Sequence, residues 1–156
     1  MPGTSDITQL DSNTLQQIAQ KSTGQAAWVV ASSMSPSAAT QVTASSGNVA
    51  AASAVATLPA VASRYNFLAG FAVTSSGSTA AAVVNVTVTG LVTGTMTYTY
   101  TSVAGATLAN QPLVVTFNPP IITSALNTAI VVTLPSLGAG NTNASVNAWG
   151  FSSILT

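Results

Sequence analysis

The chain has 156 residues, enough for one domain with its own core, but it carries almost no charge. It contains two basic residues, two acidic residues, no histidine and no cysteine, and its net charge is zero. This composition excludes a disulfide scaffold. It also argues against a nucleic-acid binder or a polybasic membrane-binding protein, so neither nucleic acid nor a membrane is an expected partner.

The N-terminal segment, residues 1–25, differs from the rest because it holds all the charges except Arg64. Asp11 or Ser12 can cap a short helix that ends at Gly24, although an extended arm fits the same residues. We therefore predict an N-terminal arm or short helix. The segment lacks the basic start and apolar block of a secretion signal, so synthesis in the cytoplasm is expected.

Residues 26–156 show apolar residues at every second position, with Gly, Pro and Asn between the apolar runs, as in an all-β domain. The expected strands, in chain order, are AAWVVASS, the two parts of TQVTASSGNVAAASAVATLPAV around Ser46-Gly47-Asn48, YNFLAGFAVT, VVNVTVT, the stretch from Met96 to Tyr100, PLVVTF, AIVVTLP and ASVNAWGF. About eight strands at this spacing predict an antiparallel β-sandwich or jelly roll.

The alternation also assigns side chains to faces. Apolar sets expected to share a face are Val84, Val86 and Val88; Met96, Tyr98 and Tyr100; Ile130, Val132 and Leu134; and Tyr65, Phe67, Phe71 and Val73. The strand PLVVTF is expected to end at Asn118-Pro119-Pro120.

Five aromatic residues allow two interpretations: Tyr65, Phe67, Phe71, Trp149 and Phe151. They could form a platform on which a sugar stacks, but packing in the core is the favoured expectation. A platform would leave Trp149 or Tyr65 exposed, whereas a purely structural protein would bury both.

No catalytic residue, metal ligand or cofactor is predicted. Without histidine or cysteine the chain has no Ser-His or Cys-His pair, and Asp6 and Asp11 are expected as solvated residues or caps. Lys21 follows no S-x-x-K motif, and Arg64 is expected as a solvated turn residue or as a salt bridge to a neighbouring subunit. We therefore expect that the chain is not an enzyme.

The surface of the stretch 83–102, VVNVTVTGLVTGTMTYTYTS, raises the question of assembly, because its outer side carries only Thr, Asn and Ser. Uncharged strands without proline are prone to pair with other chains unless neighbours cover them. We therefore expect a homo-oligomer, with a trimer as the first choice. The candidate contacts with neighbouring subunits, or with a larger structure onto which the oligomer docks, are Thr87, Thr89, Thr95, Thr97 and Thr99, together with Arg64 and Lys21.

The motifs L-P-A-V-A, T-G-L, P-L-V-V-T-F and L-G-A-G-N-T-N-A follow one another between Val55 and Phe151. In order and texture this region resembles small, uncharged β-sandwich virion proteins of tailed bacteriophages. The resemblance implies a decoration or cement protein on the capsid exterior, typically a trimer that clamps adjacent subunits of the major capsid protein. It implies no catalytic motif. A tail, neck or fibre component that binds a glycan or receptor remains an alternative, as does a bacterial surface-layer or adhesin module.

Overall fold

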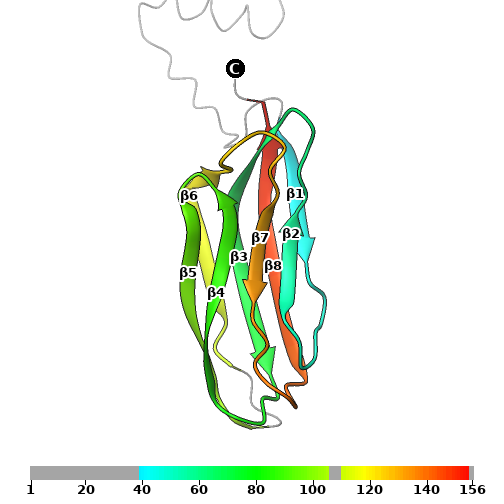
Figure 1. Ribbon diagram of the computed structural model, residues 1–156, viewed down its shortest axis with the longest axis vertical. Coiled ribbons are helices and arrows are strands. Elements are labelled where there is room, and N and C mark those ends of the chain that lie inside the picture. Colours follow the sequence, from blue (N-terminus) through cyan, green and yellow to red (C-terminus); the bar gives the residue numbers. More distant parts are fainter. Residues whose placement is uncertain (1–38, 106–109, 155–156) are drawn as a thin grey trace, which may run out of the picture. The chain divides into compact units, whose positions relative to one another are not determined.

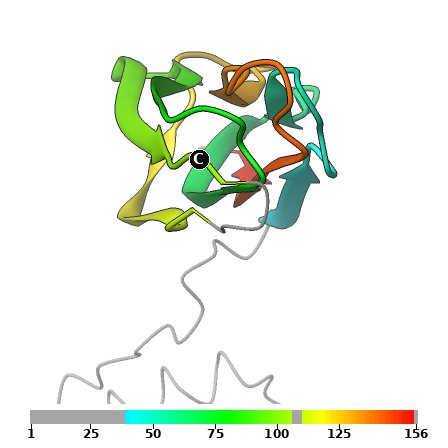
Figure 2. The same cartoon turned by 90° about the horizontal axis from the view of Figure 1, so that it is seen from below.

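The computed structural model describes residues 39–105 and 110–154, which form eight strands in two packed antiparallel sheets (Figure 1). One sheet has the order β1-β8-β3-β6 and the other has the order β2-β7-β4-β5. Seen along the strands, the sheets form two layers (Figure 2). The strands are β1 (Thr40–Ser45), β2 (Ala54–Leu58), β3 (Tyr65–Ser76), β4 (Ala82–Leu91), β5 (Gly94–Ser102), β6 (Leu113–Ile122), β7 (Ile130–Leu134) and β8 (Asn143–Ser153).

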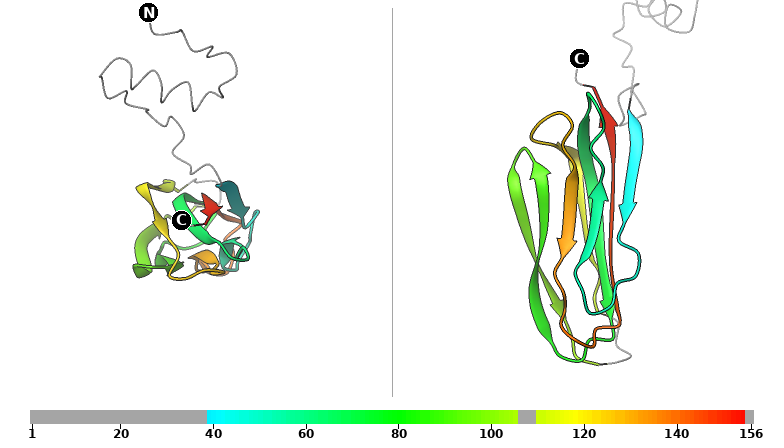
Figure 3. Two further views of the ribbon diagram at one scale, coloured as in Figure 1. Left: turned by 90° about the horizontal axis from the view of Figure 1, so that it is seen from above. Right: turned by 45° about the vertical axis from the view of Figure 1, so that its right-hand side comes forward.

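This strand order is that of a jelly roll. Every connection except the β4–β5 hairpin crosses from one sheet to the other, so most strands that follow each other in sequence lie in different layers. Strand β1 lies at an edge beside β8, although the two are far apart in sequence (Figure 3). The predicted all-β sandwich is confirmed.

The core between the sheets is built from the inward side of each strand. The expected faces of β4, β5 and β7 are confirmed: Val86 and Val88, and all three alternate residues of β7, are fully buried, and Tyr100 is nearly so. Val84, Met96 and Tyr98 are partly buried and pack against this core. Because each strand presents an apolar and a polar side in turn, the Thr and Asn residues between them face outward.

Strand β3 departs from the predicted pattern. Its register with both neighbours shifts between Leu68 and Gly70, which marks a β-bulge. The extra residue reverses the alternation, so Phe71 and Val73 point into the core while Tyr65 and Phe67 point outward. The prediction that these four side chains share one face is therefore wrong.

Strand β6 also differs from the prediction, because it does not end at Asn118-Pro119-Pro120 but continues to Ile122. It is an edge strand, where a residue without an N–H group is tolerated. Residues 117–120 of β6 are not paired with β3, and the pairing of the two strands resumes at Ile121. The predicted N-terminal arm, Lys21 and the expected strand AAWVVASS lie outside the described residues.

At one end of the sandwich, a buried side chain ties two loops to β3. Asn66, which is 1% exposed, donates from Nδ2 to the backbone oxygens of Pro59 at 2.8 Å and Thr128 at 3.1 Å. Its own backbone oxygen accepts a hydrogen bond from the N–H of Thr123 at 2.9 Å. The β2–β3 and β6–β7 loops are thus held by one residue of β3.

Candidate functional site

The outer face of the sheet β2-β7-β4-β5, which we call the threonine face, carries no ionisable side chain in its described strands. Its central row crosses all four strands, because the register aligns Val55, Thr133, Thr87 and Thr97. The remaining outward residues are Thr57, Val131 and Thr89, the cross-strand pairs Asn85–Thr99 and Val83–Thr101, and Thr95. The outward positions of these four strands are therefore occupied by Thr, Val and Asn alone, as the hairpin sequence indicated for β4 and β5.

The threonine face is open in the isolated chain. Val83 is 71% exposed and Val55 is 42% exposed, and the outward threonines of β5 are exposed as well. The hydroxyls of the five predicted contact threonines bond to no other described residue. Each can donate or accept a hydrogen bond across a contact, while its methyl group adds apolar area.

Strand β5 forms an edge of this face, since among the strands that the structure describes it pairs with β4 alone. It has nine residues, whereas β1 has six and β2 has five. The remaining edge strand, β6, contains two prolines. Natural sheets usually protect edges with charges, prolines or short strands, and β5 has none of these. A depression of about 330 Å³ borders it, lined by Thr99, Tyr100, Thr101, Gln111, Pro112 and Leu113.

The predicted contact residues fall into three groups. Thr87, Thr89, Thr95, Thr97 and Thr99 all lie on the threonine face. Arg64 lies outside that sheet, just before β3, where its Nη1 donates to Thr40 Oγ1 at 3.5 Å. Lys21 belongs to the residues that the structure does not describe.

The outer face of the other sheet, β1-β8-β3-β6, carries four aromatic side chains. Tyr65 and Phe67 come from β3, and Trp149 and Phe151 come from β8; all four are partly buried and none belongs to the core cluster. Phe67 and Phe151 are stacked, with ring centroids 4.7 Å apart and an interplanar angle of 11°. The expected core packing is therefore correct only for Phe71.

Trp149 lies directly over a glycine of the neighbouring strand. A Cβ atom added to Gly70 would come within 2.6 Å of Cζ2 of the indole and within 2.6 Å of the Val115 backbone oxygen. Only a residue without a side chain leaves room for the ring here, so the indole packs on the backbone of β3. The bulge that precedes Gly70 therefore places both Phe67 and Gly70, on which Trp149 packs, on the outer face.

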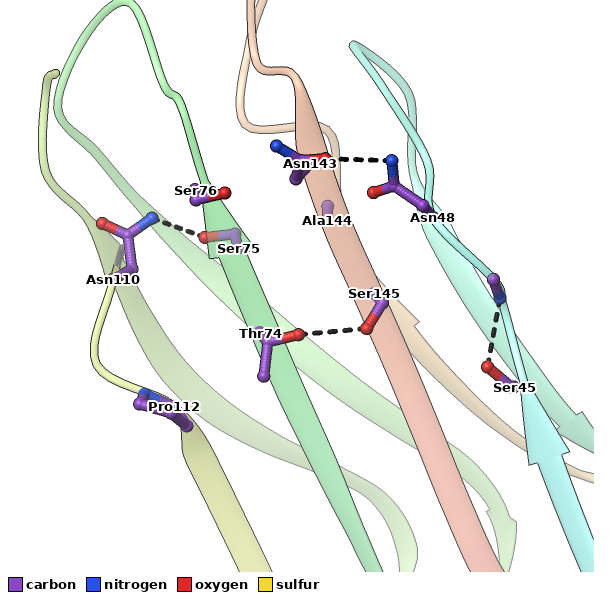
Figure 4. Close-up of a pocket in the computed structure, with 11 residues that line it drawn as sticks. Ser45, Asn48, Thr74, Ser75, Ser76, Asn110, Pro112, Asn143, Ala144 and Ser145 are labelled. Carbon is purple, nitrogen blue, oxygen red and sulfur yellow. Dashed lines mark hydrogen bonds between the residues drawn. The ribbon is translucent and has the colours of Figure 1, made fainter. Parts of the chain in front are cut away.

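Next to the aromatic side chains, the same face holds a shallow trough of about 440 Å³, whose lining includes Ser, Thr and Asn side chains as well as apolar surface (Figure 4). Two hydrogen bonds join its side chains: Thr74 Oγ1 and Ser145 Oγ are 3.0 Å apart across β3 and β8, and Asn48 Nδ2 in the loop after β1 donates to Asn143 Oδ1 at 3.0 Å. The trough is lined by Ser45, Gly47, Asn48, Thr74, Ser75, Ser76, Asn110, Pro112, Asn143, Ala144 and Ser145.

The sequence did not predict this trough. The alternation of side chains along each strand identifies Thr74 in β3 and Ser145 in β8 as outward residues. Only the antiparallel register of the two strands brings them together. The contribution of Asn48 depends on the loop after β1, and that of Asn110 on the loop before β6. Alternation identifies outward residues along one strand, whereas a site across several strands requires their pairing.

Ionisable groups are few in the described part of the chain. It contains no group of three His, Cys, Asp or Glu residues that could hold a metal ion. Burial raises the pKa of Tyr98, whose ring meets Phe71 edge-on with centroids 5.2 Å apart. The surfaces therefore offer hydroxyl, amide and aromatic groups for recognition.

Comparisons of the chain with protein-family models, curated proteins and solved structures gave no match. Within residues 39–105 and 110–154 there is no helix of the length and apolarity needed to cross a membrane. The function proposed below therefore rests on the two outer faces and on the resemblance of the sequence motifs.

Proposed function

We propose that this chain is a structural protein of a bacteriophage virion, a capsid decoration or cement protein. In this role it binds the outside of the head and reinforces the contacts between subunits of the major capsid protein. The observation that carries the proposal is the threonine face, a four-stranded surface without an ionisable side chain and with the open strand β5 at its edge. The motif resemblance between Val55 and Phe151 points to the same class of protein.

The physical reason is the low cost of covering such a face with protein. Burying an unpaired charge costs several kcal/mol, and the threonine face has none to bury. Its valines contribute apolar area, and its hydroxyls can pair with polar groups of the partner. A contact of standard size, about 1,600 Å² in total, can therefore be stable without ion pairs.

The same surface supports self-association. An open, uncharged strand such as β5 is a template for pairing with another chain, and a closed symmetric assembly is the usual way to cover it. We propose a homo-oligomer, with a trimer as the first choice, on the capsid exterior. Synthesis in the host cytoplasm is compatible with this placement.

A second candidate function is that of a tail, neck or fibre component that binds a glycan or receptor. It is supported by Trp149 and Tyr65, which are partly buried on an outer face, whereas a purely structural protein was expected to bury both. In this alternative the sheet β1-β8-β3-β6 meets the ligand, and the threonine face still joins the subunits.

Imaging of virions tests the two placements. Particles would be compared with and without this chain, and purified chain would then be added back to the deficient particles. For a decoration protein we expect regular knobs on the shell that disappear without the chain and return on its addition. Density that is confined to the tail would contradict the capsid proposal and favour the second candidate.

A further inference from the structure

We propose that the outer face of β1-β8-β3-β6 is a binding site for a neutral oligosaccharide, which runs from Trp149 to the trough that Thr74, Ser145 and Asn143 line. This inference deepens the second candidate function, in which this sheet meets a glycan, and does not depend on the assembly role, because the threonine face lies on the opposite side of the sandwich. Two neighbouring features carry it: an aromatic ring seated on the backbone and a trough of ordered hydroxyl and amide groups.

The aromatic part provides a surface for the apolar side of a sugar ring. The indole of Trp149 packs on the backbone at Gly70, and the ring remains partly exposed on the outer face. A pyranose presents C–H groups on its ring faces, which pack favourably against an aromatic π-system. The stacked pair Phe67 and Phe151 extends the apolar area beside Trp149.

The polar part suits the hydroxyl groups of a sugar, which both donate and accept hydrogen bonds. Thr74 is held by Ser145, and Asn48 is held by Asn143, so these side chains are ordered before a ligand arrives. Preorganisation of this kind lowers the entropic cost of binding. The hydroxyl of Ser76 also lines the trough and has no hydrogen-bond partner among the described residues.

The two parts form one path because they lie along the same strand. Trp149, Asn147, Ser145 and Asn143 occupy alternate positions of β8 and therefore share its outer side. Six residues of extended strand span about 20 Å, which is longer than a single sugar ring. The side chain of Asn147 lies between the ring and the trough, is exposed, and has no partner among the described residues. The ligand is therefore an oligosaccharide rather than a monosaccharide.

The absence of charge selects a neutral sugar. No Lys, Arg, Asp or Glu lies on the path from Trp149 to Asn143 or lines the trough. An acidic glycan would lose hydration of its carboxylates without gaining a cation in return. A sugar without ionised groups has no such cost.

Affinity electrophoresis provides the test. The purified chain would migrate through native gels that contain dextran, galactomannan or xyloglucan, with polygalacturonate as the acidic comparison. We expect at least one neutral polysaccharide to retard the protein and polygalacturonate to have no effect. Trp28→Phe leaves Trp149 as the single tryptophan, and in this background the same polysaccharide should shift the fluorescence emission with a saturable dose dependence.

Matched variants locate the site. Trp149→Ala should weaken binding about tenfold or more. Asn147→Asp, an exposed substitution that leaves the aromatic residues in place, should also weaken it. Thr97→Ala on the threonine face should bind as the unmodified chain does. Circular dichroism and thermal melting establish that each variant is folded.

Three results would overturn the proposal: no retardation by any of the three neutral polysaccharides, retardation by polygalacturonate alone, or equal retardation of the unmodified chain and both site variants. Sedimentation velocity on the same variants separates this site from the assembly surface. If Trp149→Ala dissociated an oligomer and no neutral sugar bound, this face would be a subunit contact, and the sugar proposal would be wrong.

Discussion

The two outer faces of this sandwich are both uncharged, but they differ in how their side chains are arranged. On the threonine face, one residue type repeats across four strands in regular register, and the hydroxyls of the five predicted contact threonines bond to no other described residue. On the opposite face, aromatic side chains are grouped around a bulge, and polar side chains are hydrogen-bonded in pairs, one across strands and one between a loop and β8. A repetitive face suits a broad contact with protein, whereas a face with ordered local groups suits a ligand of defined shape.

The largest expected effect comes from placing a charge on the threonine face. Thr97→Lys introduces an ammonium group in the central row, and its burial without a partner should weaken assembly about 100-fold or more. Sedimentation velocity measures the change. Thr43→Lys, at an exposed position on the other sheet, is the matched control and should assemble normally. Equal effects of both lysines would remove the distinction between the faces.

The second-largest expected effect concerns Gly70, on whose backbone the indole of Trp149 packs. Gly70→Ala places a methyl group against the indole and a backbone oxygen, so we expect a loss of about 1–3 kcal/mol in the free energy of unfolding. In the Trp28→Phe background the emission of Trp149 should shift as well. Denaturant titration followed by fluorescence measures both quantities.

Gly94→Ala is the control for this substitution. Gly94 has a φ of 81° and open space around its Cβ position, so alanine there strains the backbone without touching the indole. It should lower stability and leave the Trp149 emission unchanged. An emission shift of the same size in both variants would show that Gly70 has no special relation to the ring.

A smaller effect is expected from salt. Only Arg64 carries a charge among the described residues, so few ionic contacts can be screened. The oligomer should persist from low salt to about 1 M NaCl in sedimentation velocity experiments. Dissociation over this range would mean that ion pairs hold the assembly, and the threonine face would lose its proposed role.

The smallest effect is a dependence of stability on alkaline pH. Burial raises the pKa of Tyr98 above its ordinary value of 10.0, so in the unfolded chain this phenol loses its proton at lower pH than in the fold. The contribution of Tyr98 to stability is therefore complete below about pH 10 and is lost as pH rises through the raised pKa. Thermal melting between pH 7 and pH 11 should show the decline, and Tyr98→Phe should reduce it. An identical decline in this variant would assign the effect to other groups.

The sequence predicted regular strands well and irregular ones poorly. From Val84 to Val88 in β4, and in β5 and β7, alternation placed the buried side chains correctly, because the register shift in β4 comes only after Val88. In β3 a single bulge before Gly70 reversed the alternation and moved Phe67 to the outer face. In β6 the two prolines suggested an end, but an edge strand accommodates them.

The candidate surfaces were predictable to different extents for the same reason. The β4–β5 part of the threonine face follows from alternation within one hairpin, so Thr97 and its neighbours could be identified before the fold was known. Its continuation over β7 and β2 depends on strand pairing. The trough combines Asn48, Thr74 and Ser145 from three separate segments, and their proximity depends on the jelly-roll pairing of β1, β8 and β3. Short-range patterns contain no information about which distant strands become neighbours.

The buried amide of Asn66 has a consequence for the motions of the chain. Loops usually exchange their amide hydrogens early, through local fraying that leaves the remainder intact. Here the N–H of Thr123 is bonded to the backbone of Asn66, whose side chain holds the β2–β3 and β6–β7 loops together. We therefore expect these loops to open together with β3, so the protection of the Thr123 amide from hydrogen exchange should approach that of the core strands. Hydrogen exchange at this one loop amide would then report on global unfolding.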